Sequence, residues 1–237
     1  MGLFDRLQEE FDSTPDKAPE TPKAKRKRPK GFLNPHVTPP RGLTTFGHHP
    51  EDVRGALGTK YSKCSEVVGY VPRASTVDLV TMGVWQSIDV VCHLALQIGR
   101  PVDFVGSTWS ISRKSANLIT AGVIDGTFRR VRILTDFRQK TNNVEAADQL
   151  QSVLKPEDYR ITTNHSKVYL ISDEGEGIED PWYFTVLGSS NLTSNSRCES
   201  QVIREGEEVY RFHRKWIEEV MDNSAFFGEE VKMEGEA

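Results

Sequence analysis

Residues 165–171 read His-Ser-Lys-Val-Tyr-Leu-Ile, and residues 182–191 read Trp-Tyr-Phe-Thr-Val-Leu-Gly-Ser-Ser-Asn. The apolar run in each stretch is typical of a buried β-strand. Side chains two apart on a strand share a face, which places His165 with Lys167 and Ser189 with Asn191. If the two strands are neighbours, an imidazole, an ammonium, a hydroxyl and a carboxamide converge on one spot. These groups suit a phosphodiester.

Strands and helices alternate along the chain around these two stretches. Apolar runs predict strands at 77–82, 102–105, 130–136 and 161–171, and helical spacing predicts helices at 85–98, 113–124, 143–154 and 209–220. Residues 107–110 and 173–181 are expected to be loops. The last helix is expected to bury Val209, Phe212, His213, Trp216, Ile217 and Val220. This alternation indicates an α/β domain.

The two strings fit H-x-K and G-S-x-N, and their order resembles the phospholipase D superfamily over residues 101–221. The resemblance implies a mixed sheet flanked by helices. It also implies that His165 attacks phosphorus to form a phosphohistidine, that Glu199 orients the histidine, and that Lys167, Ser189 and Asn191 bind the non-bridging oxygens. No metal or cofactor is implied. Either string alone also fits an exposed strand edge or a turn.

One position departs from the superfamily pattern, which places an Asp five residues after the motif Lys. Here that position is Ser172, and Asp173 comes one residue later. Because a shift of one residue on a strand turns a side chain to the other face, either a bulge restores Asp173 or the role is absent.

The chain holds one H-x-K that is followed by G-S-x-N, and its other H-x-K, residues 213–215, falls in the last predicted helix. The implied reaction also needs a general acid for the leaving oxygen. In the superfamily a second motif histidine does this, and members with one motif pair two subunits about a two-fold axis. The resemblance therefore implies a homodimer with both copies of His165 facing one phosphate.

Composition excludes several other classes of protein. The formal net charge is -4 over 237 residues, so any attraction to nucleic acid must come from local patches. The 3 cysteines have no C-x-x-C spacing, which argues against a disulfide framework or a zinc site, and Cys92 is expected in the core. His48-His49 has no acidic partners at ligand spacing. The sequence has no run long enough to span a membrane and no signal peptide, so we expect a cytoplasmic protein.

The two ends of the chain differ in composition from its centre. Residues 1–45 are expected to form a disordered basic arm, residues 46–223 the phospholipase D-like domain, and residues 224–237 an acidic flexible tail. Candidate nucleic-acid-binding residues in the arm are Lys25, Arg26, Lys27 and Arg28. The same run also fits a solvated linker, and the N-terminal segment also fits a docking peptide for a protein partner.

The sequence as a whole predicts a metal-independent phosphodiesterase that cleaves nucleic acid, DNA rather than RNA. Six further cations are expected to flank the cleft: Arg113, Lys114, Arg129, Arg130, Arg138 and Lys140. Two alternatives stay open. One is a phospholipase D-like binding or docking module that has lost its chemistry, and the other is a lipid or small-molecule phosphodiesterase.

Overall fold

The computed structural model describes residues 44–45, 52–58, 63–81, 85–193 and 198–226. The predicted basic run 25–28, nearly all of the predicted arm and the tail from residue 227 onward lie outside the described residues. His48 and His49 lie outside them too. The predicted boundaries after residues 45 and 223 remain predictions.

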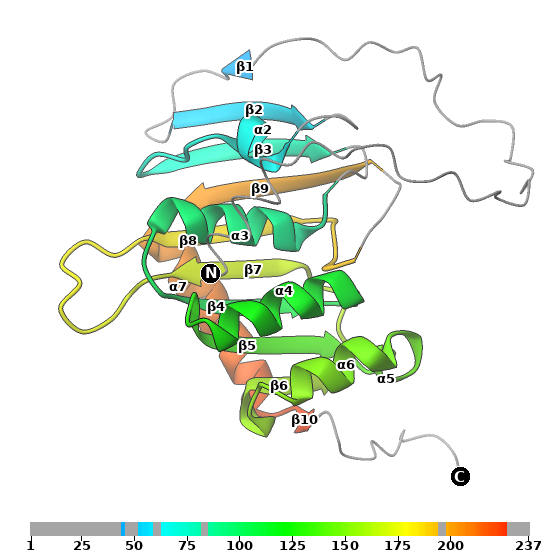
Figure 1. Ribbon diagram of the computed structural model, residues 1–237. Coiled ribbons are helices and arrows are strands. Elements are labelled where there is room, and N and C mark those ends of the chain that lie inside the picture. The colour runs from blue at the N-terminus through cyan, green and yellow to red at the C-terminus, as the bar shows by residue number, and fades with distance from the viewer. Residues whose placement is uncertain (1–43, 46–51, 59–62, 82–84, 194–197, 227–237) are drawn as a thin grey trace, which may run out of the picture.

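The described residues form one mixed sheet of ten strands in the order β1-β2-β3-β9-β8-β7-β4-β5-β6-β10 (Figure 1). Parallel pairing joins β2 to β3, β4 to β5 and β5 to β6, and the other neighbours are antiparallel. The strands are β1 (Thr44–Thr45), β2 (Asp52–Gly58), β3 (Ser75–Thr81), β4 (Val102–Thr108), β5 (Phe128–Asp136), β6 (Tyr159–Thr162), β7 (Val168–Ser172), β8 (Tyr183–Gly188), β9 (Glu199–Glu205) and β10 (Ala225–Phe226).

Helices cover both faces of this sheet. They are α2 (Cys64–Val68), α3 (Ser87–Ile98), α4 (Arg113–Ile124), α5 (Gln139–Asn142), α6 (Val144–Gln151) and α7 (Glu207–Asp222), with a 3₁₀ turn η1 (Pro156–Asp158). Figure 1 shows α3, α4 and α6 on the near face and α7 crossing behind the sheet. The α/β class and the mixed sheet flanked by helices are thereby confirmed.

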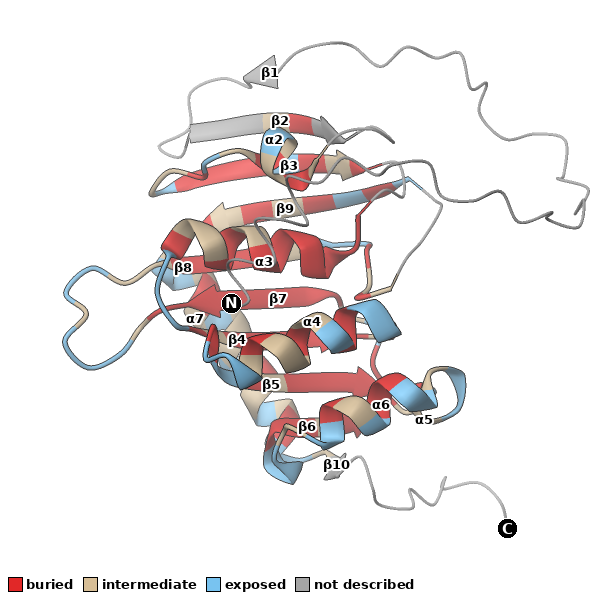
Figure 2. Cartoon of the chain, in the orientation of Figure 1, coloured by how far each residue is buried: buried red, intermediate tan, exposed pale blue. Residues whose placement is uncertain are grey.

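Alternation along the central strands divides the apolar interior into two cores. On β4, Phe104 belongs to the core under α3, α4 and α6, whereas the next residue, Val105, belongs to the core under α7. β7 is buried along its whole length, as Figure 2 shows. Strands covered on both faces are apolar on both, which is why 168–171 reads as a continuous hydrophobic run. Cys92 is fully buried in the first core, as expected.

The stripe predicted for the last helix is wrong in part. The fully buried residues of α7 are Tyr210, Ile217 and Met221, and Phe212 is 66% exposed. His213 is half-buried and accepts a hydrogen bond at Nδ1 from Trp216 Nε1 at 2.9 Å. The helix therefore faces the sheet through a stripe rotated from the predicted one, and His213 has the structural role expected of it.

Three strand predictions also need correction. The strand expected over 161–171 is two strands, β6 and β7, which are separated by β4 and β5 in the sheet. Residues 163–167 make the crossing between them. Ser107 and Thr108, expected in a loop, are the last residues of β4, and β9 was not predicted at all.

Candidate active site

The two motif strings meet at one end of the central strands β7 and β8, and this end of the sheet is called the motif edge. β7 and β8 are antiparallel neighbours with Val168 opposite Leu187, and Gly188 N donates to Lys167 O at 3.3 Å. The start of β7 and the end of β8 therefore fall side by side. The condition that the two strands be neighbours is met.

The expected alternation of faces is nevertheless wrong for these side chains. His165 and Lys167 precede β7, and Ser189 and Asn191 follow β8, so none of the four belongs to a strand. His165 is exposed while Lys167 is only 9% exposed. Their placement comes from hydrogen bonds of the connecting segments and not from the pleat of a sheet.

Asn164 holds the H-x-K segment in place. Its side-chain oxygen accepts from Ser166 N at 2.9 Å and from Ser166 Oγ at 2.7 Å. Its Nδ2 lies 3.1 Å from Ser107 Oγ and 3.2 Å from each of the carbonyl oxygens of Thr108 and Leu134. Its backbone N–H donates to Asp136 Oδ2 at 3.0 Å. The segment that carries His165 is thus tied to the ends of β4 and β5.

The charges of Lys167 and Glu199 interact with each other. Lys167 Nζ donates to His165 O at 2.6 Å. Burial lowers the pKa of Lys167, and the negative charge of Glu199 opposes that shift. Glu199 is the first residue of β9, is buried, and accepts a hydrogen bond from Ser189 Oγ. The Glu199 carboxylate therefore stabilises the ammonium form of Lys167 and holds the Ser189 hydroxyl by a hydrogen bond.

The replacement Glu199→Gln is expected to lower the pKa of Lys167 further. Removing the negative charge takes away the attraction that favours the ammonium form, whereas burial still disfavours it. A ¹³C NMR titration of the lysine Cε signals measures this pKa, with Lys167→Arg assigning the resonance and Glu208→Gln, on the exposed face of α7, as the control. An unchanged or higher pKa in Glu199→Gln would contradict the coupling.

Glycine is required at the start of the second string. A Cβ on Gly188 would lie 2.8 Å from Gln201 Cα on the neighbouring strand β9 and would collide with the carbonyl oxygen of Ser200. Ser200 N in turn donates to Ser189 Oγ at 3.1 Å. The close approach of β8 and β9 therefore sets the position of the Ser189 hydroxyl.

Asn191 faces the end of β4. Its side-chain oxygen accepts from Trp109 N at 3.3 Å and lies 3.4 Å from Thr108 Oγ1. With the oxygen occupied, the amide N–H groups are the donors left to bind an anion. Tyr169, buried beneath, donates to Ser190 O at 2.8 Å and fixes the turn.

His165 and Glu199 are not joined within one chain. The His165 ring contacts the Trp109 ring, with centroids 6.2 Å apart. Among the described residues it makes no hydrogen bond to Glu199, whose carboxylate bonds Ser189 instead. The orienting contact that the superfamily resemblance implies is therefore absent from this arrangement.

The departure at Ser172 is resolved without a bulge. The pairing of β7 runs in continuous register from Val168 to Ser172, where the strand ends. Asp173 follows it, 1% exposed, accepting from Trp182 N at 2.7 Å and pairing with Arg100. Asp173, expected in an exposed loop, is buried at the edge opposite His165.

Two of the six cations expected around the cleft, Arg129 and Arg130, lie away from the motif strings. Arg129 pairs with Asp103 and Arg130 with Asp158, near the start of β5. That position is about 20 Å along the strand from Asp136. Arg113, Lys114, Arg138 and Lys140 lie on segments that follow β4 and β5, on the same side of the sheet as the motif strings. Of these, Arg138 approaches the Trp109 ring.

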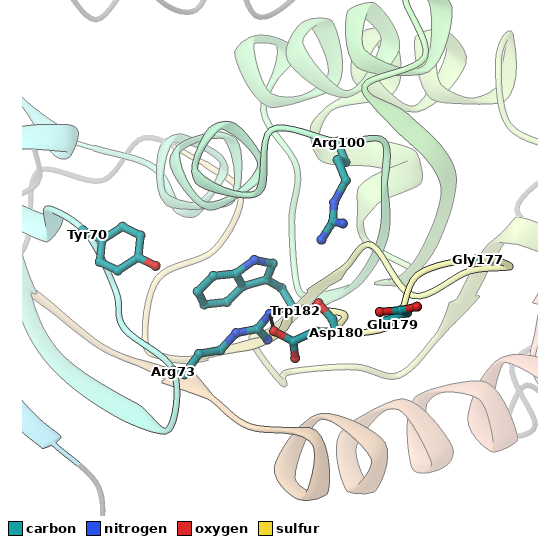
Figure 3. Close-up of a pocket in the computed structure, with 7 residues that line it drawn as sticks. All are labelled: Tyr70, Arg73, Arg100, Gly177, Glu179, Asp180 and Trp182. Atoms are coloured by element: carbon teal, nitrogen blue, oxygen red, sulfur yellow. Dashed lines mark hydrogen bonds and ion pairs between the residues drawn. The ribbon is translucent and has the colours of Figure 1, made fainter.

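A hollow of about 640 Å³ lies at the opposite edge, beside the loop after β7. Figure 3 shows Tyr70, Trp182 and Arg100 gathered around it, with Arg73 against the Trp182 ring. Arg73 is already paired with Asp180 and Glu205. This hollow contains no nucleophile of the kind found at the motif edge.

Two searches of the described residues bear on metals and membranes. They contain no group of three or more His, Cys, Asp and Glu side chains placed to hold a metal ion. None of their helices combines the length and apolar character that crossing a membrane requires.

Sequence reasoning missed three residues of this edge: Asn164, Asp136 and Trp109. Asn164 directly precedes His165 and is a polar residue inside the stretch 161–171 that was expected to be one strand. Asp136 was counted as the end of a strand, and Trp109 was placed in a polar loop. Their contacts join residues 28 to 82 positions apart, which no local pattern reveals.

Comparison with known proteins gives matches among solved structures. Nuc from Salmonella typhimurium, a phospholipase D family member, aligns with a TM-score of 0.41 and 15% identity over 56% of this chain and 88% of its own. In fold, this chain is similar to a phospholipase D family member. NucT from Helicobacter pylori aligns with a TM-score of 0.45 and 13% identity, covering 64% of this chain and 99% of NucT. Polyphosphate kinase from Porphyromonas gingivalis aligns with a TM-score of 0.45 and 13% identity, covering 66% of this chain and 27% of the kinase.

No family model matches the sequence, and no curated protein matches it. The solved structures show a likeness in fold alone. With TM-scores below 0.5 they carry no argument about substrate or reaction, which must come from the residues of this chain.

Proposed function

We propose that the chain is a phosphodiesterase that hydrolyses nucleic acid, DNA rather than RNA, through a phosphohistidine. The observation that supports this most is the meeting of His165 and Lys167 with Ser189 and Asn191 where β7 begins and β8 ends. The segments that meet there carry an exposed imidazole, an ammonium, a hydroxyl and an amide. A nucleophile next to several donors is what attack on a phosphodiester requires.

In the proposed reaction an imidazole nitrogen of His165 attacks phosphorus, and the bond from phosphorus to the leaving oxygen breaks. The leaving oxygen takes a proton from a general acid. Water then loses a proton to that same group and attacks phosphorus, and the N–P bond breaks, which releases a phosphate monoester and restores the imidazole. Lys167, Ser189 and Asn191 hold the non-bridging oxygens, where the transition state concentrates negative charge. Glu199 supports Lys167 and Ser189 from behind.

The general acid is proposed to come from a second copy of the chain. H-x-K followed by G-S-x-N occurs once in the sequence, since the other H-x-K, residues 213–215, lies within α7. His165 is exposed at the edge of the sheet, where another subunit can approach. A two-fold axis through this edge would set the partner subunit's His165 on the other side of the same phosphate. The basic run 25–28 adds affinity for phosphates in this proposal.

The test is DNA cleavage in EDTA by wild type, by His165→Ala, and by mixtures of the two subunits refolded together. Wild type is expected to retain its activity in EDTA. Because one site needs two histidines, activity should follow the square of the wild-type fraction, about one quarter at equal mixing. A linear fall would overturn the shared site, and loss of all cleavage in EDTA would overturn the metal-independent mechanism.

A further inference from the structure

Trp109 lies beside both motif strings. It follows β4, its ring centroid is 6.2 Å from that of His165, and its backbone N–H bonds the side chain of Asn191 at 3.3 Å. The ring is half-buried, and the indole N–H is buried without an acceptor among the described residues.

Arg138 stands next to Trp109 on the connection from β5 to α5. Its guanidinium carbon is 6.0 Å from the Trp109 ring centroid, and its side chain is 57% exposed. The ion pair of Arg138 with Asp136 is long, 3.9 Å, and Asp136 already accepts from two backbone N–H groups, those of Arg138 and Asn164. The arginine is therefore a cation that can turn toward a ligand without breaking a short ion pair.

An aromatic ring thus lies beside the exposed His165, and a cation lies beside that ring. Proteins that bind single strands combine aromatic rings on which bases stack with cations that follow the phosphates. Bases in a duplex are paired and stacked on one another, so their faces cannot reach such a ring unless the duplex opens. A site of this kind distinguishes single strands from duplexes and tolerates any base.

We propose that Trp109 and Arg138 form a subsite that stacks the nucleobase next to the scissile phosphate, and that the substrate is single-stranded. The proposal rests on the phosphodiesterase function proposed above and names the class of its substrate. Trp109 contributes stacking to the base. Arg138 contributes charge to a neighbouring phosphate.

The experiment measures binding on the full chain carrying His165→Ala, so turnover does not enter. Fluorescence anisotropy compares three labelled oligonucleotides: a single strand, the same strand with abasic sites, and a duplex. Adding Trp109→Ala is expected to weaken binding of the single strand about 5- to 150-fold. Trp109→Phe should restore most of this loss, and Trp216→Phe, on α7 behind the sheet, is the matched control.

Binding of the abasic strand should be the same with Trp109 and with Ala at that position, because no base is present to stack. Arg138→Gln should reduce the slope of log affinity against log salt by about 1, as expected for one phosphate contact. Equal affinity of the parent and Trp109→Ala for the single strand would overturn the subsite. So would an equal loss on the abasic strand, which would show that Trp109 only supports the fold.

Activity of the unmutated chain separates this inference from the function on which it rests. Binding that depends on Trp109, in a wild type that cleaves neither single strands nor duplex, would overturn the hydrolysis and support the subsite. Cleavage of DNA with the same kcat/KM in wild type and Trp109→Ala would support the hydrolysis and overturn the subsite.

Discussion

Replacing His165 with alanine is expected to lower turnover on the order of 10⁴-fold or more, the loss typical of removing a nucleophile from a site whose groups act as a unit. No other histidine of the described residues lies at this edge. The remaining donors, Lys167, Ser189 and Asn191, still bind phosphate but have nothing with which to form the covalent intermediate. Single-turnover cleavage of a labelled oligonucleotide measures the loss.

Stability should be almost unchanged in the same variant. His165 is exposed and its ring makes no hydrogen bond to another described residue, so the free energy of unfolding should move by about 0.5 kcal/mol or less. Mass spectrometry after an alkaline quench should find an oligonucleotide adduct on wild type and none on the variant, since the N–P bond of phosphohistidine is labile in acid. His213→Asn, behind the sheet, serves as control. Activity within tenfold of wild type would refute the nucleophile.

The helix α4 shows what local pattern can predict. Its predicted bounds, 113–124, are those observed. Ser112 caps the N-terminus by accepting from Ser115 N, and the turn after Ile124 ends the helix. Each of these signals is contained in the helix or next to it, so the sequence carries it directly.

The strand β9 shows what local pattern cannot predict. Its inward residues are Glu199, Gln201, Ile203 and Glu205, of which three are polar, so no apolar alternation marks it as a strand. They are tolerated inside because distant groups satisfy them: Gln201 bonds Ser87 at 2.9 Å, and Glu205 accepts from Ala74 N and Arg73. Partners more than 100 residues away set this strand and, with it, the position of Glu199.

Part of the candidate site also follows from local sequence pattern, and part depends on contacts between distant residues. The motif strings and the edge where they meet follow from the sequence, because two apolar runs separated by a polar loop are expected to pair. The orientation of His165 does not follow from the sequence, because it depends on the hydrogen bonds of Asn164 to the ends of β4 and β5. The resemblance assigns Lys167, Ser189 and Asn191 to phosphate binding, which stays a prediction, and it gave Glu199 a contact to His165 that the single chain does not make.

Replacing Asn164 is expected to have the second largest effect, on folding and on turnover together. Asn164→Ala removes the acceptor of two bonds from Ser166 and the donor to three oxygens, all buried or half-buried. Leaving such groups unpaired should cost about 2 to 4 kcal/mol of unfolding free energy. The freed segment also misplaces His165, and a displacement of about 1 Å can cost about 100-fold in rate.

Asn164→Asp is expected to be more damaging than Asn164→Ala at neutral pH, although it keeps the size of the side chain. The new carboxylate would face two carbonyl oxygens and the Ser107 hydroxyl oxygen, with Asp136 close by. Burial among acceptors raises the pKa of a carboxyl in the folded state above its unfolded value. Such a variant is least destabilised below the unfolded pKa, about 3.9, and loses stability as pH rises through the folded pKa.

Urea unfolding at pH 5 and at pH 8 separates the two variants. The difference in unfolding free energy from wild type should grow with pH for Asn164→Asp and stay constant for Asn164→Ala. Where Asn164→Ala is still folded, kcat should fall while the affinity for single strands, carried by Trp109 and Arg138, changes little. A loss confined to affinity would mean that Asn164 shapes the binding surface. A loss in kcat would mean that its hydrogen bonds to Ser166 aim the imidazole at phosphorus, because a merely structural role lowers the amount of folded protein and not the rate of the folded fraction.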